Sequence, residues 1–138
     1  MAIDKINQMA KKFPVLVITG PRQSGKTTIC KHAFPGYRYV TLENPDDKAF
    51  AMKDPRSFLA QYDAKVIFDE AQNVPELFSY LQERVDNDNI SGQYILSGSQ
   101  NFMLMEKISQ KSHLYALDNF SAEKNNKKLR DFYFRCLN

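Results

Sequence analysis

The chain has 138 residues, of which 43% are hydrophobic, and a formal net charge of +3. This length and composition predict one domain, or a large part of one, with enough apolar residues for a core. The charge is too small to indicate nucleic-acid binding by itself, and the apolar runs are too short to cross a membrane. Two cysteines outside any metal-binding spacing, with no signal peptide before them, favour a reducing, cytoplasmic compartment.

Apolar spacing and Pro or Gly breaks predict helices and strands that alternate along the chain. In chain order we expect a helix over 3–12, a strand over 13–19, a helix over 27–34, a strand over 37–42, helices starting near 45 and 55, a strand over 65–70, a helix over 75–86, a strand over 93–96, a helix over 102–108 and a short fifth strand over 114–117. This alternation is typical of an α/β fold with a mostly parallel sheet, here of about five strands, flanked by helices.

Residues 20–27 match the pattern G-x-x-x-x-G-K-[ST], the phosphate-binding P-loop, between a predicted strand and a predicted helix. The glycines let backbone N–H groups curl around phosphate oxygens, and Lys26 adds a compact positive charge on the β- and γ-phosphates. The Thr27 hydroxyl is a hard oxygen ligand for Mg²⁺, and the following helix directs its positive end at the same anion. The alternative is a glycine turn with an incidental lysine. The expected nucleotide-binding residues are Gly20, Pro21, Arg22, Gln23, Ser24, Gly25, Lys26, Thr27 and Thr28.

The third predicted strand ends in two acids, Asp69 and Glu70. Ligands of open α/β sheets bind at the carboxyl ends of the strands, so both acids are expected beside the P-loop. There Asp69 would hold Mg²⁺, directly or through water, and Glu70 would polarise a water molecule for attack on the γ-phosphate. The alternative is an acidic pair that only caps the next helix. GTPases and nucleotide kinases usually lack the second acid.

Small polar residues end the fourth predicted strand, which we expect between the strand before the P-loop and the strand that ends in Asp69 and Glu70. The hydroxyl of Ser97, or of Ser99 as second choice, would contact the γ-phosphate or the attacking water; an ordinary Ser-Gly turn is the alternative. Residues 96–100 look like the signature motif of ABC transporters, but they follow the Asp-Glu strand instead of preceding it, which argues against that class. Because the guanine-reading N-K-x-D pattern is missing, the expected ligand is ATP with Mg²⁺.

Together the motifs resemble prokaryotic AAA-superfamily P-loop ATPases. The resemblance rests on G-P-R-Q-S-G-K-T-T at 20–28, F-D-E-A-Q at 68–72 and I-L-S-G-S-Q at 95–100, and it covers roughly residues 1–110. It implies an ATPase core there, usually followed in this family by a C-terminal domain of uncharacterised function. It implies as catalytic residues Glu70, Lys26, Ser97 and Ser99, and as Mg²⁺ ligands Thr27 and Asp69.

The C-terminal segment, residues 111–138, departs from the family pattern. The Gly-Arg pair expected before the fifth strand is missing, and the segment is too short for the usual second domain, so we expect a chain truncated or rearranged after its ATPase core. An arginine that completes phosphoryl transfer can raise the rate about 10³-fold or more, so we expect slow ATP hydrolysis. The alternatives are a nucleotide-binding remnant without turnover and an ATP-switched nucleic-acid-binding module.

The same end of the chain is basic. Residues 106–138 contain seven Lys or Arg and four acidic residues. We expect a solvated tail, mobile over 118–128, with contact to a nucleic acid or a protein partner as the alternative. An oligomer, in which a neighbouring subunit supplies an arginine, is compatible with the sequence.

Overall fold

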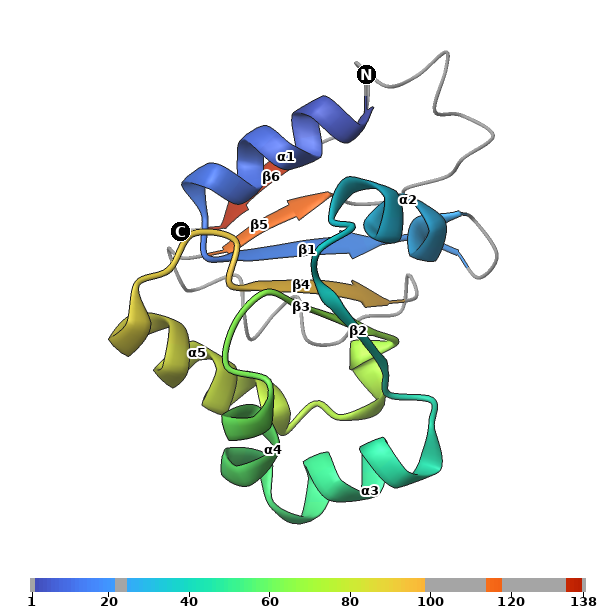
Figure 1. Ribbon diagram of the computed structural model, residues 1–138, viewed down its shortest axis with the longest axis vertical. Coiled ribbons are helices and arrows are strands. Elements are labelled where there is room, and N and C mark those ends of the chain that lie inside the picture. Colours follow the sequence, from blue (N-terminus) through green and yellow to red (C-terminus); the bar gives the residue numbers. More distant parts are fainter. Residues whose placement is uncertain (1, 22–24, 99–113, 118–133, 138) are drawn as a thin grey trace.

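The strands form a single sheet in the order β2-β3-β4-β1-β5-β6 (Figure 1). The structure is a computed structural model that describes residues 2–21, 25–98, 114–117 and 134–137. The strands are β1 (Val15–Thr19), β2 (Arg38–Thr41), β3 (Val66–Asp69), β4 (Tyr94–Gly98), β5 (Leu114–Leu117) and β6 (Phe134–Leu137). Strands β1 to β5 are parallel to one another, and β6 is antiparallel to β5.

The α/β class, the mostly parallel sheet and the five predicted strands are confirmed, but the described residues add a sixth strand. Only four residues make up β6, and they alternate too briefly for a period to be recognised in the sequence. The predicted helix over 102–108 and the expected mobile stretch 118–128 lie outside the described residues.

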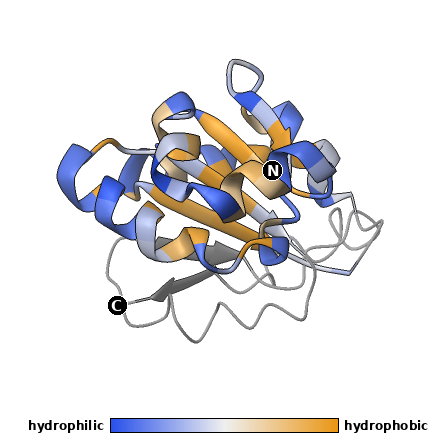
Figure 2. Cartoon of the chain, turned by 90° about the horizontal axis from the view of Figure 1, so that it is seen from below, coloured by the Kyte–Doolittle hydropathy of each residue, from blue (hydrophilic) through white to orange (hydrophobic). Residues whose placement is uncertain are grey.

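Helices cover both faces of the sheet. They are α1 (Ala2–Lys12), α2 (Lys26–Ala33), α3 (Pro45–Lys53), α4 (Pro55–Gln61), α5 (Leu77–Asp88) and a short 3₁₀ turn, η1 (Ala71–Asn73). Apolar residues of α1 and α2 pack against one face, and those of α3, α4, η1 and α5 pack against the other. Figure 2 shows hydrophobic residues along the strands and mixed hydrophilic and hydrophobic residues along the helices.

Strand β1 illustrates why its sequence reads as a continuous apolar run. All five of its residues are buried. Val15 and Val17 face the α3–α5 side, while Leu16 and Ile18 face α1 and α2, because successive side chains of a strand point to opposite faces. A parallel strand buried on both faces therefore needs hydrophobic residues at every position.

The two short helices after β2 begin at the start signals that the sequence contains. The Asn44 side chain accepts hydrogen bonds from the backbone N–H groups of Asp46 and Asp47, and Pro45 occupies the first turn of α3. Asp54 caps α4 in the same way, accepting from the backbone N–H and the hydroxyl of Ser57. Such caps satisfy donors that have no partner inside the helix.

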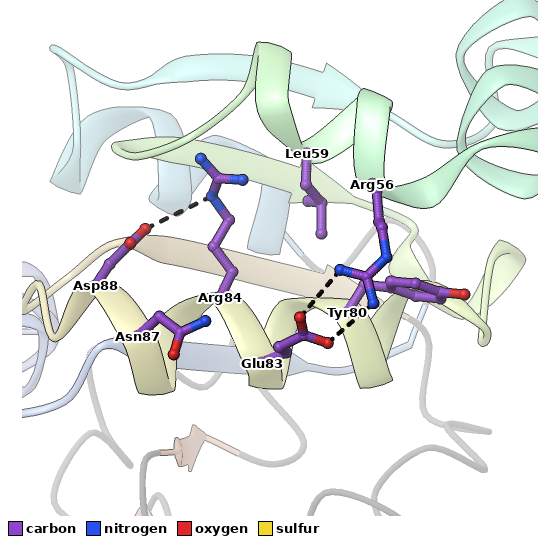
Figure 3. Close-up of a pocket in the computed structure, with 7 residues that line it drawn as sticks. All are labelled: Arg56, Leu59, Tyr80, Glu83, Arg84, Asn87 and Asp88. Carbon is purple, nitrogen blue, oxygen red and sulfur yellow. Dashed lines mark hydrogen bonds and ion pairs between the residues drawn. The ribbon is translucent and has the colours of Figure 1, made fainter.

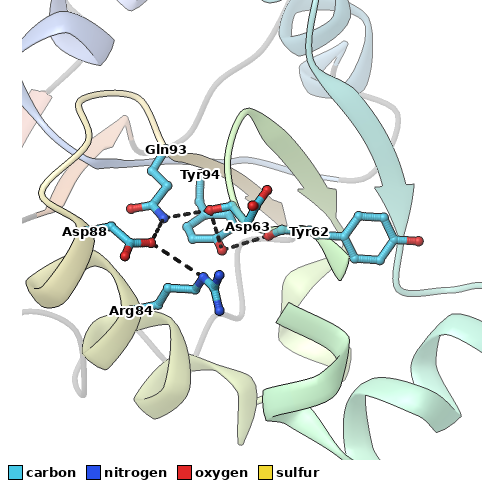
Figure 4. A network of polar contacts seen from close by, with 6 residues as sticks. All are labelled: Tyr62, Asp63, Arg84, Asp88, Gln93 and Tyr94. Carbon is cyan, nitrogen blue, oxygen red and sulfur yellow. Dashed lines mark hydrogen bonds and ion pairs between the residues drawn. The ribbon is translucent and has the colours of Figure 1, made fainter. Parts of the chain in front are cut away.

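A polar network connects the start of β4 to the carboxyl end of α5 and to the loop before β3 (Figure 4). The Tyr94 hydroxyl donates to the Tyr62 carbonyl at 2.7 Å, and Gln93 Nε2 donates to the Asp63 carbonyl and to Asp88 Oδ2, both at 2.7 Å. Burial raises the pKa of Tyr94, so the phenol stays a neutral donor. The network therefore holds the amino-terminal edge of the sheet, opposite the edge where β1, β3 and β4 end.

Gly92 lies at this amino-terminal edge in a left-handed conformation, with φ 65°. A Cβ at this position would lie 2.8 Å from the Tyr37 hydroxyl and 3.0 Å from the Ala10 carbonyl oxygen. Gly92→Ala is therefore expected to lower the free energy of unfolding by about 1–3 kcal/mol, measured by urea denaturation. Gly36→Ala is the matched control, since a Cβ there meets nothing within 4 Å; it should change stability by less than about 1 kcal/mol. Equal stabilities of the two variants would contradict the steric argument.

Candidate functional site

The sequence motifs meet at the carboxyl edge of the sheet. Strand β4 lies between β1 and β3, as the sequence analysis expected. The Gly20 N–H, immediately after β1, donates to the carbonyl of Gly98, the last residue of β4, at 3.2 Å. Asp69 ends β3 on the other side of β4. The P-loop, the acidic pair and the serine of β4 therefore share one edge, although up to 77 residues separate them in the sequence.

The P-loop leads directly into α2. Gly25 caps this helix in a left-handed conformation with φ 92°, which glycine adopts without steric cost. The Lys26 side chain is only 3% exposed, and its ammonium group donates to the Pro21 carbonyl at 3.3 Å. Of the other predicted nucleotide-binding residues, Gly20 is buried and Pro21 and Thr28 are exposed, while Arg22, Gln23 and Ser24 lie outside the described residues.

The Asp69 carboxylate is the centre of the polar contacts at this edge. Its Oδ2 accepts from the Thr27 hydroxyl at 2.8 Å and from the Tyr39 hydroxyl at 2.5 Å. Its Oδ1 accepts from the Ser97 hydroxyl at 2.5 Å and from the Glu70 backbone N–H at 3.0 Å. Burial raises the pKa of Asp69, but these four hydrogen bonds to the charged form outweigh burial and lower it overall. Asp69 is therefore held as an anion.

The pair Thr27 and Asp69 has the chemistry of a magnesium site. Because the Thr27 hydroxyl donates its hydrogen bond to Asp69, the lone pairs of Thr27 Oγ1 stay available to a cation. Both groups offer the hard oxygen atoms that Mg²⁺ prefers. The described residues contain no cluster of three or more acidic, His or Cys side chains. Thr27 and Asp69 fit a cation that takes its remaining ligands from phosphate and water, as Mg²⁺ commonly does.

Glu70 follows in an unusual backbone conformation. Its φ of 54° and ψ of 47° are left-handed, a region that costs a non-glycine residue about 1–2 kcal/mol and that recurs at functional sites. Its side chain is 9% exposed, and Gln72 Nε2 donates to its Oε1 at 2.7 Å. The Gln72 Oε1 atom is itself buried, with no hydrogen-bond partner among the described residues. The short turn η1 thus brings an amide next to the carboxylate of Glu70.

Ser97 is fully buried and lies inside the site, where it donates to Asp69. Its position between β1 and β3 agrees with the sequence analysis, while its expected contact with a phosphate or a water molecule stays a prediction. Ser99, the second choice for this contact, lies outside the described residues.

Tyr39 is the site residue that sequence reasoning missed. It lies on β2, whose parallel register pairs it with Ile67 of β3, two residues before Asp69. Burial and the hydrogen bond to the Asp69 carboxylate raise the pKa of Tyr39, so its hydroxyl stays protonated. A tyrosine in a strand usually belongs to the core, and only the placement of β2 beside β3 distinguishes this one.

Cys30 lies behind the P-loop, one turn along α2. It is fully buried among the apolar residues between α1, α2 and the sheet, where it packs as a small hydrophobic side chain. Burial, together with the nearby Asp69 carboxylate, raises the pKa of its thiol to about 12, although Lys26 acts in the opposite direction.

A separate cavity of about 270 Å³ lies between α4 and α5 (Figure 3). Its Arg56 forms a two-point ion pair with Glu83, at 3.0 and 3.3 Å, and its Arg84 lies 3.6 Å from the Asp88 carboxylate. Both arginines are thus neutralised by acids of α5, and none of the predicted site residues lines this cavity. Among the described residues, no helix is both long enough and apolar enough to span a membrane.

Comparisons with known proteins agree with the motifs. The profile of the AAA domain family matches residues 12–120. Uncharacterised proteins of Mycobacterium tuberculosis and Mycobacterium bovis are each 33% identical over 100 residues, which is 71% of this chain but 22% of either relative. The chain therefore spans about a fifth of the length of these relatives.

Solved structures show the same fold. The Walker-type ATPase PABY2304 of Pyrococcus abyssi has a TM-score of 0.55 and 15% identity, over 94% of this chain and 56% of its own. DnaA of Aquifex aeolicus, solved with AMPPCP, has a TM-score of 0.53 and 16% identity, over 96% and 51%. A DNA replication initiation factor has a TM-score of 0.51 and 17% identity, over 75% and 37%. With the family profile matched over most of its length, and with a P-loop and an Asp-Glu pair at one edge of a parallel sheet, the chain belongs to the AAA domain family of P-loop ATPases.

Proposed function

We propose that this chain binds ATP with Mg²⁺ at the carboxyl edge of β1, β4 and β3, and that it hydrolyses the bound ATP slowly to ADP and phosphate. The observation that carries the proposal is the 2.8 Å hydrogen bond from the Thr27 hydroxyl to the Asp69 carboxylate. It joins the residue after the P-loop lysine to the acid that ends β3. These are the two oxygen donors that the chemistry of an ATP-bound magnesium ion requires.

In this proposal the P-loop backbone and Lys26 bind the phosphates. The amino-terminal end of α2, which begins at Lys26, directs its unpaired backbone N–H groups toward the anion. Lys26 would exchange its bond to the Pro21 carbonyl for bonds to phosphate oxygens, which are stronger because both partners are charged. Thr27 and Asp69 would hold Mg²⁺, which when bound neutralises charge on the β- and γ-phosphates.

Glu70 is the proposed general base. Its carboxylate would accept the proton of the attacking water, while Lys26 stabilises the charge that develops on the γ-phosphate oxygens. One carboxylate oxygen accepts from Gln72, and within the described part of the chain this leaves the second oxygen, Oε2, for water. Ser97 or Ser99 would orient the phosphate or the water from β4. Without an arginine from the family's Gly-Arg pair, the expected turnover is slow.

Partners and location are proposed from sequence alone. The basic segment 111–138 is proposed to contact a nucleic acid or a protein, and an oligomer would offer a source for the missing arginine. A cytoplasmic location stays a prediction.

Asp69→Asn tests the magnesium part of the proposal. The variant keeps the shape of the side chain and removes its charge, so it should lose most of the Mg²⁺-dependent ATP affinity. The measurement is the Kd for ATP by calorimetry in Mg²⁺ and in EDTA. We expect the gain in ATP affinity that Mg²⁺ causes to fall about 10-fold in the variant, while the Kd measured in EDTA changes less than about 3-fold.

Asp46→Asn is the control for this measurement. Asp46 is an exposed carboxylate in the first turn of α3, and it should leave both Kd values unchanged. A wild-type protein whose ATP affinity does not respond to Mg²⁺ would contradict the proposed Thr27–Asp69 site.

A further inference from the structure

Tyr39 contacts the Asp69 carboxylate from the edge strand of the sheet, and none of the motifs includes it. Its hydroxyl lies 2.5 Å from Asp69 Oδ2, the same oxygen atom that accepts from Thr27 at 2.8 Å. Strand β2, which carries Tyr39, occupies the end of the strand order next to β3. The Asp69 side chain is thus held from β2, from α2 and from β4.

The ring of Tyr39 is held in place by α2. The Lys31 ammonium group lies 4.0 Å from the ring centroid, and the ring packs against the apolar cluster between α1, α2 and the sheet. Lys31 lies one helical turn after Thr27, so the same face of α2 contacts Tyr39 and Asp69. A cation over the face of the ring is attracted to it, which helps to hold the ring in this orientation. The position of the hydroxyl is therefore determined by packing as well as by its hydrogen bond.

The hydroxyl groups of Tyr39 and Thr27 would have different roles when a cation binds. Thr27 has to serve two partners, since its oxygen would ligate Mg²⁺ while its hydroxyl still donates a hydrogen bond to Asp69 Oδ2. On the other oxygen, Oδ1, the donors are Ser97 and the Glu70 backbone N–H. Tyr39 is thus the donor that holds Oδ2 without a role as a ligand. Outer partners of this kind orient metal ligands, and their removal typically costs 10–100-fold in metal affinity or activity.

We propose that Tyr39 is a positioning residue of the magnesium site, which fixes the orientation of the Asp69 carboxylate so that Oδ2 faces Thr27 and the cation. The proposal rests on the proposed function and extends it by one residue from an edge strand that the nucleotide motifs do not reach. It places the Mg²⁺ response of the site under the control of β2, and so of the contact between β2 and α2.

Tyr39→Phe tests the proposal, because the variant keeps the ring and its contact with Lys31 and removes only the hydroxyl. The measurement is binding of a non-hydrolysable ATP analogue by calorimetry, in EDTA and over a range of Mg²⁺ concentrations. We expect the Mg²⁺ concentration for half of the affinity gain to rise about 10-fold, with the affinity in EDTA changed less than about 2-fold. A merely structural role would change the affinity in EDTA or the melting temperature instead.

Tyr37→Phe is the matched control. Tyr37 precedes β2, and its hydroxyl donates to the Gly92 carbonyl at 2.7 Å, at the opposite edge of the sheet. The Tyr37→Phe variant loses the same hydroxyl oxygen, but Tyr37 makes its hydrogen bond to Gly92 and not to Asp69. Its Mg²⁺ response should therefore equal that of the wild type.

A wild-type Mg²⁺ response in Tyr39→Phe would overturn the positioning role while leaving the proposed function intact. Absence of any Mg²⁺ response in the wild-type protein would overturn both. An equal shift in Tyr39→Phe and Tyr37→Phe would also overturn the role, because the effect would then follow from a general loss of sheet contacts.

Discussion

Lys26→Ala is expected to weaken ATP binding about 100-fold, since it removes a charge-assisted contact to phosphate that the backbone of the loop cannot replace. Lys26 is 3% exposed, and its ammonium group donates to the carbonyl of Pro21, a residue of the P-loop itself. Folding should not depend on it, because alanine favours the helix and the lost bond is a single one to a neutral carbonyl. The measurement is the Kd for ATP with Mg²⁺ by calorimetry.

The control for this variant is Lys53→Ala. Lys53 lies exposed in the last turn of α3 and carries the same charge, so its removal changes the net charge equally without touching the loop. Its ATP affinity should stay within about 2-fold of the wild type, because exposed distant charges are screened. Equal affinity of Lys26→Ala and the wild type would show that the P-loop does not bind ATP.

Glu70→Gln is expected to lower the rate of phosphate release at least about 100-fold while ATP affinity stays within about 3-fold, because glutamine has the same shape but cannot accept a proton. The Gln72 amide now donates to Glu70 Oε1 at 2.7 Å, and the carbonyl oxygen of a glutamine at position 70 can accept the same bond. The left-handed backbone is unchanged by the substitution. The measurement is phosphate release under saturating ATP and Mg²⁺.

Glu76→Gln is the matched control for the loss of one carboxylate. Glu76 is exposed just before α5 and should release phosphate at the wild-type rate. Unchanged release in Glu70→Gln would remove Glu70 from the role of base. A wild-type protein that binds ATP and releases no phosphate would favour the nucleotide-binding remnant.

The P-loop and the acidic pair could be predicted because each is contiguous in the sequence and each chemistry requires fixed residue types. The position of β4 between β1 and β3 was expected for a sheet that carries both motifs. The contact between Thr27 and Asp69 agrees with that position. The starts of α3 and α4 near residues 45 and 55 also could be predicted, since a proline in the first turn is a local start signal.

Tyr39 and Gln72 could not be assigned in this way. The role of Tyr39 depends on which strand lies beside β3, and apolar alternation determines the face of a strand but not its neighbour. Gln72 was read as part of the family motif, but its bond to Glu70 depends on the left-handed backbone at Glu70, a conformation that sequence rarely indicates for glutamate. Strand β6 is determined by pairing with β5, which is a tertiary contact.

The burial of Cys30 has a consequence for how this site responds to oxidants. Peroxides and disulfides react with the thiolate form of cysteine, and a rise of the pKa from 9.0 to about 12 reduces the thiolate fraction near neutral pH roughly 1,000-fold. The side chain is also closed to solvent. We therefore expect the sulfur atom three residues after Thr27 to react slowly with oxidants. Helix α2 should then stay unmodified through changes of redox state that would modify an exposed thiol.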